Sequence, residues 1–285
     1  MSLTRLLAAG LVAAGAALGS LVDTGGPTEP RRAGAYFVVA ADFHVHAFPG
    51  DGSLPPWEIA REAGRRGLHA VVVSNHNQTR APRFGAWLRR EGLPLLIPAQ
   101  EITTPAFHIV GVGVTSTIDW RLPGADIIRA VQAQGGVAIA AHPVRASWKG
   151  SDEMLALLDG AEVAHPLTAL RVTGRSDLTA FFMRARTINP DIAPIGSSDF
   201  HMIHPLAACR TYVFAESVTV AGVLDAVRAG RTVAQDQDGV LYGAPALTLL
   251  LDPLDLSHGA QGRRSLRLLS IGLAFAGMLM LLVRR

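Results

Sequence analysis

The sequence predicts an α/β fold with a largely parallel sheet, and three observations lead to this prediction. Short apolar runs alternate with amphipathic stretches from residue 36 to residue 253, as in strands that are followed by helices. Nearly every apolar run is followed by His, Asp or Glu. No internal repeat or low-complexity linker interrupts residues 33–257, so we expect one domain there.

The individual elements follow from run length and periodicity, and the first helix begins with proline, which suits the first helical turn. In chain order we expect a strand at 36–43, a helix at 56–66, strands at 70–74, 95–99 and 107–112, a helix at 125–134, a strand at 137–141, a helix at 152–158, a strand at 161–164, a helix at 177–186, a strand at 193–196 and a helix at 220–229.

Composition limits the class of protein. The chain has 285 residues, 49% of them hydrophobic and 17% charged, with 29 Gly and 17 Pro, which excludes a disordered chain or a coiled coil. The single cysteine, Cys209, excludes an intramolecular disulfide framework and a multi-cysteine zinc site. Because Cys209 has apolar neighbours, we expect it in the core.

Charge is unevenly distributed along the chain. Residues 33–257 contain 18 basic and 21 acidic residues, a net charge of −3, while the two ends together carry +6. The basic residues therefore flank apolar segments, which is typical of membrane contact and not of a surface that binds the phosphate backbone. We expect no specific nucleic-acid binding.

Each end of the chain is predicted to form an apolar helix. Residues 1–22, in which an uncharged run follows Arg5, are interpreted as a signal peptide or an N-terminal membrane anchor. Residues 266–283 are interpreted as a C-terminal transmembrane helix with arginines on both sides. These predictions give a membrane-anchored protein whose catalytic domain lies outside the cytoplasm.

Polar residues that suit metal binding occur at the predicted strand ends. In parallel strands these ends meet at one mouth of a barrel, so the residues are expected to share one pocket. They are His44, His46 and Asp51 after the first strand, His76 after the second, Glu101 after the third, His108 inside the fourth, His142 after the fifth, and Asp199 and His201 after the seventh. Imidazole and carboxylate without thiolate suit Zn²⁺, Mn²⁺ or Fe²⁺.

The same residues give the chain a resemblance to the PHP (polymerase and histidinol phosphatase) superfamily over residues 38–234. The resemblance rests on residues 42–46 (DFHVH), 51–53, 74–77, 100–101, 107–111, 141–143 and 198–201. Residues 210–213 with 229–232 also resemble the carbaryl-hydrolase-like branch. The resemblance implies a distorted (β/α)7 TIM-like barrel over residues 33–257 that holds three divalent ions.

The resemblance also implies how the ligands are distributed. The first metal would be held by His44, His46, Glu101 and Asp199, the second by Glu101, His108 and His142, and the third by Asp51, His76 and His201. The implied activity is a phosphoesterase that uses a metal-bridged hydroxide on a small phosphorylated substrate. Hydrolysis of a non-phosphate ester, carbamate or amide is an alternative, and a non-catalytic, membrane-tethered metal-binding domain is another.

Further residues complete the predicted site. Glu101, Asp199 and His165 are predicted to be catalytic, with His165 as a substrate contact or proton donor. Arg145 and Lys149 follow His142 in a loop and are predicted to bind the substrate anion. The family usually has Asp where this chain has Asn75. An amide can hydrogen-bond a ligand ring but cannot raise its basicity, so the hypothesis is weaker or slower binding of the third metal, which Asn75→Asp would tighten.

Overall fold

The structure is a computed structural model of the 285-residue chain. It describes residues 3–22, 29–88, 91–144, 148–166, 174–202, 205–257 and 261–282. The chain divides into two compact units, Pro27–Ser257 and a second unit formed by Met1–Gly26 with His258–Arg285.

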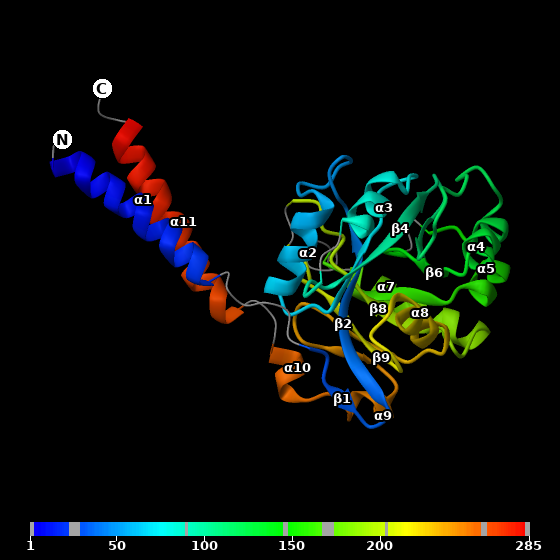
Figure 1. Ribbon diagram of the computed structural model, residues 1–285. Coiled ribbons are helices and arrows are strands. Elements are labelled where there is room, and N and C mark those ends of the chain that lie inside the picture. Colours follow the sequence, from blue (N-terminus) through cyan, green and yellow to red (C-terminus); the bar gives the residue numbers. More distant parts are fainter. Residues whose placement is uncertain are drawn as a thin grey trace. The chain divides into compact units, whose positions relative to one another are not determined.

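The larger unit is built on one mixed sheet whose strands follow the order β11-β10-β9-β2-β3-β4-β5-β6-β7-β8, with β1 paired to β2. Its long strand β2 crosses the middle of the unit in Figure 1. The strands are β1 (Arg32–Ala33), β2 (Tyr36–Val45), β3 (Ala70–Val73), β4 (Leu95–Thr103), β5 (His108–Val112), β6 (Val137–Ala140), β7 (Gly160–Ala164), β8 (Ala193–Gly196), β9 (Arg210–Ala215), β10 (Thr232–Gln235) and β11 (Leu241–Gly243).

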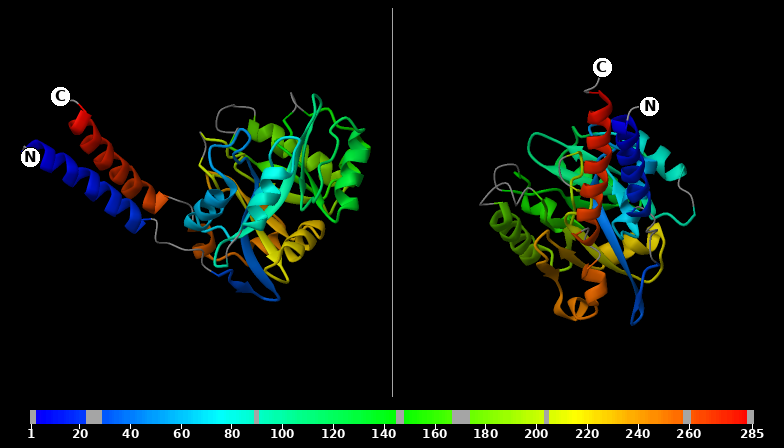
Figure 2. Two further views of the ribbon diagram at one scale, coloured as in Figure 1. Left: turned by 45° about the horizontal axis from the view of Figure 1, so that its top comes forward. Right: turned by 90° about the vertical axis from the view of Figure 1, so that its left-hand side faces the viewer.

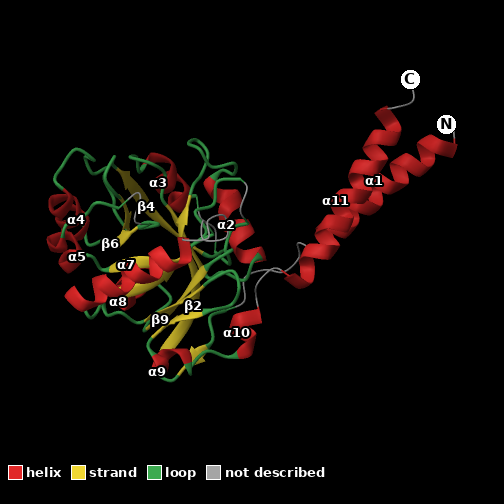
Figure 3. Cartoon of the chain, turned by 180° about the vertical axis from the view of Figure 1, so that it is seen from behind, coloured by secondary structure: helices red, strands yellow, loops and turns green. Residues whose placement is uncertain are grey.

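Helices cover the strands from outside, as Figure 3 shows for α4, α5, α7 and α8. In this unit they are α2 (Pro56–Arg65), α3 (Arg80–Trp87), α4 (Gly124–Ala133), α5 (Asp152–Leu157), α7 (Gly174–Ile188), α8 (Val220–Arg228), α9 (Pro245–Thr248) and α10 (Pro253–Ser257). Cys209 is buried, as predicted, and burial raises the pKa of its thiol.

The sheet is mixed, so the prediction of a largely parallel sheet holds only for part of it. Strands β2, β3 and β4 are parallel, as are β6, β7 and β8, but β5 runs antiparallel to both of its neighbours. Four residues join β4 to β5, which suffices for a hairpin and is too short for a parallel crossover. Strands β9 to β11 are also antiparallel to their neighbours.

The last strand in the order, β8, returns to β2 and β9, so the sheet is a nearly closed barrel that fits a TIM-like architecture. The backbone of Val45, at the end of β2, forms a parallel bridge with Phe200, just after β8. The Thr211 hydroxyl on β9 bonds the N–H and the carbonyl of Gly196 on β8, both at 2.8 Å. A Cβ at Gly196 would lie 2.4 Å from the Arg210 carbonyl oxygen, so only glycine permits this approach.

The second unit consists of the terminal helices α1 (Leu3–Val22) and α11 (Gln261–Leu282), which pack side by side (Figure 2). The Ser270 hydroxyl donates to the Gly15 carbonyl at 2.8 Å. Within the described residues, no helix combines the length and the apolar character needed to cross a membrane. The predicted transmembrane helix at 266–283 therefore gains no support; its uncharged helical part, from Leu268 to Leu282, spans only about 22 Å.

Candidate metal centre

The predicted ligand residues come together at one end of the barrel. The strands β2, β3, β4, β6 and β8 bring their C-terminal ends there, so the residues at or just after those ends converge. His108 was predicted inside its strand but is the first residue of β5. Because β5 is reversed, its first residue lies beside the C-terminal ends of its neighbours, and the His108 carbonyl accepts a bond from Ala141 N–H at 3.1 Å.

Four donor atoms converge on one point in the interior of this site. The His44 and His46 Nε2 atoms lie 3.1 Å apart. Glu101 Oε2 lies 3.3 Å from both imidazole nitrogens. Asp199 Oδ1 lies 3.4 Å from His44 Nε2 and 3.2 Å from His46 Nε2. The His44, His46 and Glu101 side chains are almost completely buried.

These separations fit a metal ion. The His44, His46 and Asp199 donors lie 3.1–3.4 Å apart, which is the spacing of ligands that each lie about 2.0 Å from a tetrahedral zinc ion. Glu101 Oε2 and Asp199 Oδ1 are buried, and imidazole nitrogens lie within 3.5 Å of both without forming a hydrogen bond of good geometry. A buried, ionised carboxylate is costly unless a hydrogen bond or a positive charge lies beside it, and a bound cation would supply that charge.

Glu101 also faces a second group of imidazoles through its other oxygen. Glu101 Oε1 lies 2.7 Å from His108 Nδ1 and 3.3 Å from His142 Nε2. One carboxylate therefore presents one oxygen to the pair on β2 and the other to His108 and His142. This is the arrangement that a carboxylate needs to bridge two metal ions.

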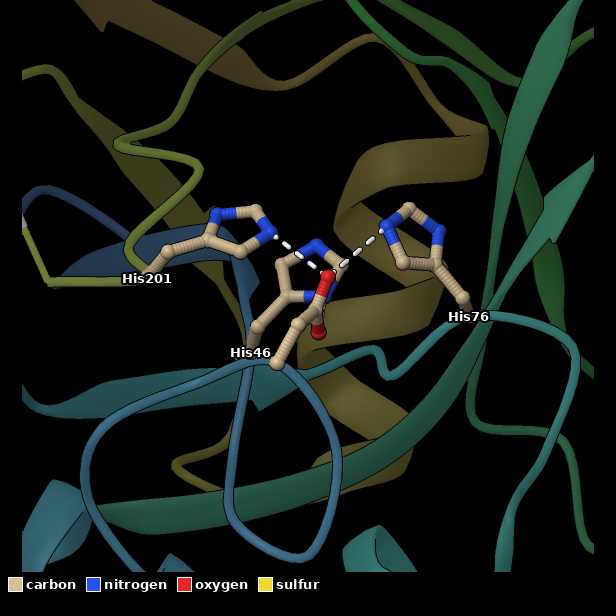
Figure 4. A group of neighbouring side chains, drawn as sticks. His46, His76 and His201 are labelled. Carbon is tan, nitrogen blue, oxygen red and sulfur yellow. Dashed lines mark hydrogen bonds and ion pairs between the residues drawn. The ribbon is translucent and has the colours of Figure 1, made fainter.

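A third group lies at the open side of the site and contains Asp51, His76 and His201, as predicted. Asp51 Oδ2 lies 3.1 Å from His76 Nε2 and 3.0 Å from His201 Nε2, the two contacts drawn as dashed lines in Figure 4. His46 Nδ1 joins this group at 3.1 Å from Asp51 Oδ1, so His46 has one ring nitrogen in each of two groups. His76 Nδ1 lies 2.7 Å from Glu101 Oε2.

The charges in this site depend on each other. Burial alone opposes protonation of His46, but the adjacent carboxylates of Asp199 and Glu101 raise its pKa to about 9. Burial favours the neutral acid at Glu101 and Asp199, yet the charge of His44 keeps both pKa values well below their usual range. The carboxylates are therefore ionised and require positive charge beside them, from protonated rings or from bound cations.

Two of the predicted ligands adopt a backbone conformation that is uncommon for residues with a side chain. His142 and Asp199 have positive φ values of 30° and 47°, which are uncommon for residues other than glycine. His142 N–H donates to Glu162 Oε2 at 2.6 Å, and Ser198 N–H donates to Asp42 Oδ1 at 2.9 Å. Strained residues held in this way cluster at functional sites.

Sequence reasoning missed Glu162, which lies inside β7 and is completely buried. Its Oε1 lies 3.0 Å from His44 Nδ1 and accepts a 2.5 Å bond from the Ser197 hydroxyl. Burial raises the pKa of Glu162, but the charge and hydrogen bond of His44 lower it to about 2. Glu162 thus fixes the ring whose opposite nitrogen faces the metal position. A charged residue within an apolar strand was the available signal.

The remaining predicted site residues lie in different surroundings. His165 is buried, with its Nε2 atom 3.5 Å from Asp199 Oδ2, so it contacts the site from the interior. Lys149 is exposed, and its N–H donates to the Ala106 carbonyl beside the start of β5. Arg145 lies outside the described residues.

The Asn75 side chain bonds backbone groups and not a ligand ring, and the hypothesis of weaker third-metal binding stays a prediction. The Asn75 side chain bonds the backbone of the loop that leads to Asp51: its amide nitrogen donates to the carbonyls of Ala47 at 2.6 Å and Pro49 at 3.2 Å, and its oxygen accepts from Ala47 N–H. His76 Nδ1 instead faces the Thr103 hydroxyl at 2.6 Å.

The Asn75→Asp variant is therefore expected to lower the free energy of unfolding by about 1–3 kcal/mol, because a buried carboxylate would face two carbonyl oxygens. Urea unfolding of the variant and the wild type checks this, and a metal-competition titration checks the predicted tightening of metal binding. Tighter metal binding at unchanged stability would show that position 75 supports a ligand after all.

Comparisons with known proteins address the fold and the family. No protein-family model matches the chain. The uncharacterized protein MJ1587 of Methanocaldococcus jannaschii is 30% identical over 137 residues, which cover 43% of this chain and 80% of that protein. A two-domain protein from Bacteroides vulgatus, which contains a predicted PHP-like metal-dependent phosphoesterase, superposes with a TM-score of 0.62 at 21% identity, covering 79% of this chain and 72% of that chain. PsfC from Pseudomonas syringae gives 0.50 at 17% identity, covering 80% and 99%.

Proposed function

This chain belongs to the protein family of MJ1587 and has the fold of the Bacteroides vulgatus protein that contains a PHP-like phosphoesterase, and on that premise we propose that it is a metal-dependent phosphoesterase. The proposed substrate is a small phosphorylated molecule. The barrel is then the distorted (β/α)7 form that the sequence resemblance implies.

One observation carries the proposal: the His44, His46 and Asp199 donors lie 3.1–3.4 Å from one another, and Glu101 faces this group with one oxygen and a second group of imidazoles with the other. A structural site would need only the first set, with no open side. A carboxylate shared between two groups suits hydrolytic chemistry, in which two ions act on one phosphoryl group.

The proposed ligand sets are those of the sequence resemblance, with three divalent ions, Zn²⁺, Mn²⁺ or Fe²⁺. When bound, such ions lower the pKa of water and neutralise charge on phosphate oxygens. The chain's own residues determine the direction of approach. Asp51, His76 and His201 have side chains that are 44%, 38% and 33% exposed, whereas those of His44 and His46 are fully buried. The substrate therefore enters past the third group.

His165 is proposed to move a proton at the buried side of the site. Its Nε2 atom lies 3.5 Å from Asp199 Oδ2, and its ring packs edge-on against that of His142 at 5.3 Å between centroids. An imidazole held in this way can donate a proton to the leaving oxygen. Lys149 and Arg145 are proposed to attract the substrate anion from the loop that follows His142.

Removal of metal from the full-length chain is expected to reduce hydrolysis of p-nitrophenyl phosphate to background, because the imidazoles and carboxylates alone offer no activated nucleophile. Dipicolinate treatment, elemental analysis and reconstitution with Zn²⁺, Mn²⁺ or Fe²⁺ check this expectation. Full activity in the stripped protein would contradict the proposal.

The same preparation distinguishes the alternative functions. Hydrolysis of p-nitrophenyl acetate but not of phosphate esters would identify a non-phosphate ester, carbamate or amide hydrolase. If the metal-loaded protein hydrolyses neither p-nitrophenyl phosphate, nor p-nitrophenyl acetate, nor bis-p-nitrophenyl phosphate, it is a non-catalytic metal-binding domain.

A further inference from the structure

A cavity of about 760 Å³ opens beside the third ligand group, and Asp51 and His76 form part of its wall. The rest of its wall includes the loop at Pro49 and Gly50, residues 75–78, the start of α3 and Thr117. This volume falls in the range of pockets that hold small organic ligands. The cavity therefore adjoins the exposed side of the metal centre, through which the substrate enters.

Most polar groups in the cavity wall already have partners. Asn77 bonds the backbone of Thr103 with both its amide oxygen and its amide nitrogen. The Thr117 hydroxyl bonds that of Thr79, and Gln78 Oε1 accepts from Ala81 N–H at 3.2 Å. These contacts shape the wall and occupy the Asn77 amide, the Thr117 hydroxyl and the Gln78 amide oxygen.

The Arg80 guanidinium, unlike these groups, is available to bind a ligand. Arg80 is the first residue of α3, its side chain is exposed, and within the described part of the chain its guanidinium makes no ion pair. Among the described residues of the cavity wall, it is the one lysine or arginine. A guanidinium offers several N–H donors in a plane, a geometry that matches two oxygens of a phosphate group.

The position of Arg80 is fixed by the packing of α3. A Cβ at Gly85 would lie 2.2 Å from Pro56 Cβ, so α3 and α2 approach closely at this glycine. At the helix start, Arg83 N–H donates to the Thr79 carbonyl at 3.0 Å. The Arg80 backbone is therefore held at a constant place relative to His76, four residues earlier.

We propose that Arg80 binds a phosphate group of the substrate in this cavity, beside the third ligand group. The inference rests on the proposed function. It specifies the substrate as a phosphate ester whose phosphate group contacts the Arg80 guanidinium at the start of α3. Arg80 is a binding residue, so its removal weakens binding and leaves the chemical step largely intact.

The test uses the full-length, metal-loaded chain and its Arg80→Met, Arg80→Lys and Arg83→Met variants. Binding of inorganic phosphate is measured by calorimetry, and kcat and KM are measured with p-nitrophenyl phosphate. Arg83 lies on the same helix outside the cavity wall and serves as the matched control.

Arg80→Met is expected to raise both the phosphate Kd and KM by about tenfold or more, with kcat changed less than about twofold, because a charge-assisted contact is lost. Arg80→Lys should give an intermediate value, and Arg83→Met should match the wild type. Metal content should be the same in all four proteins.

The outcomes separate the two proposals. Equal phosphate affinity in Arg80→Met and Arg83→Met would overturn the role of Arg80, whatever the activity. A wild-type protein that binds phosphate through Arg80 but cleaves no phosphate ester would overturn the proposed function alone.

Discussion

Replacing Glu101 with Gln is expected to remove two bound metal ions and to lower kcat for p-nitrophenyl phosphate by about a thousand-fold or more. The Glu101 oxygens face two separate groups, at 3.3 Å from His44 and 2.7 Å from His108. An amide keeps the shape of the side chain but has one acceptor oxygen and no charge. Both groups would lose a shared anionic ligand, and metal-dependent stabilisation is worth several kcal/mol.

Elemental analysis and steady-state kinetics of Glu101→Gln provide the measurement. Glu153→Gln is the matched control, because Glu153 pairs with Arg129 on the surface at 2.7 Å. The control should retain full metal content and full kcat. A Glu101→Gln protein with wild-type metal content would exclude the bridging role.

Replacing Glu162 with Gln is expected to weaken metal binding by about 10- to 100-fold, although this residue is not itself a predicted ligand. Its two oxygens accept from His44, Ser197 and the His142 N–H. In the Gln variant, an NH₂ group would replace one of the two accepting oxygens. The groups that donate to that oxygen would then face another donor and stay buried without a hydrogen-bond partner. The free energy of unfolding should also fall by about 1–3 kcal/mol.

A chelator-competition titration measures the metal affinity of Glu162→Gln, and thermal unfolding of the metal-loaded protein measures its stability. Glu162→Asp separates the effect of charge from that of position, because it keeps the carboxylate but shortens the side chain. Its metal affinity should lie between those of Glu162→Gln and the wild type. If Glu162→Gln bound metal as tightly as the wild type, Glu162 would contribute only to packing.

Much of the barrel could be predicted because its strands are short apolar runs that end in polar residues. The strand at 193–196 has the predicted limits, and the helix predicted at 56–66 ends one residue earlier. Helix α3 was missed because Pro82 and Gly85, which usually end helices, lie within it. Pro82 is tolerated because it lies in the first turn, where no intrahelical N–H bond is lost.

The predicted ligands lie in one site because the C-terminal ends of parallel strands converge, and this convergence does not depend on the conformation of the loops. The roles of Glu162 and Asn75 could not be predicted, since both depend on contacts between distant segments. Glu162 meets His44 across 118 residues of chain, and Asn75 meets Ala47 across 28. The reversal of β5 follows instead from its four-residue link to β4, which was missed because β4 extends to Thr103, beyond its predicted end at residue 99.

The reversed strand constrains how this molecule can change in evolution. Glu101 and His108 stand on one hairpin, where Thr103 pairs with His108 and Glu101 with Val110. Inserting a single residue into the turn between them would shift the pairing by one place and turn the imidazole toward the opposite face. The length of this turn therefore determines whether Glu101 and His108 can face each other.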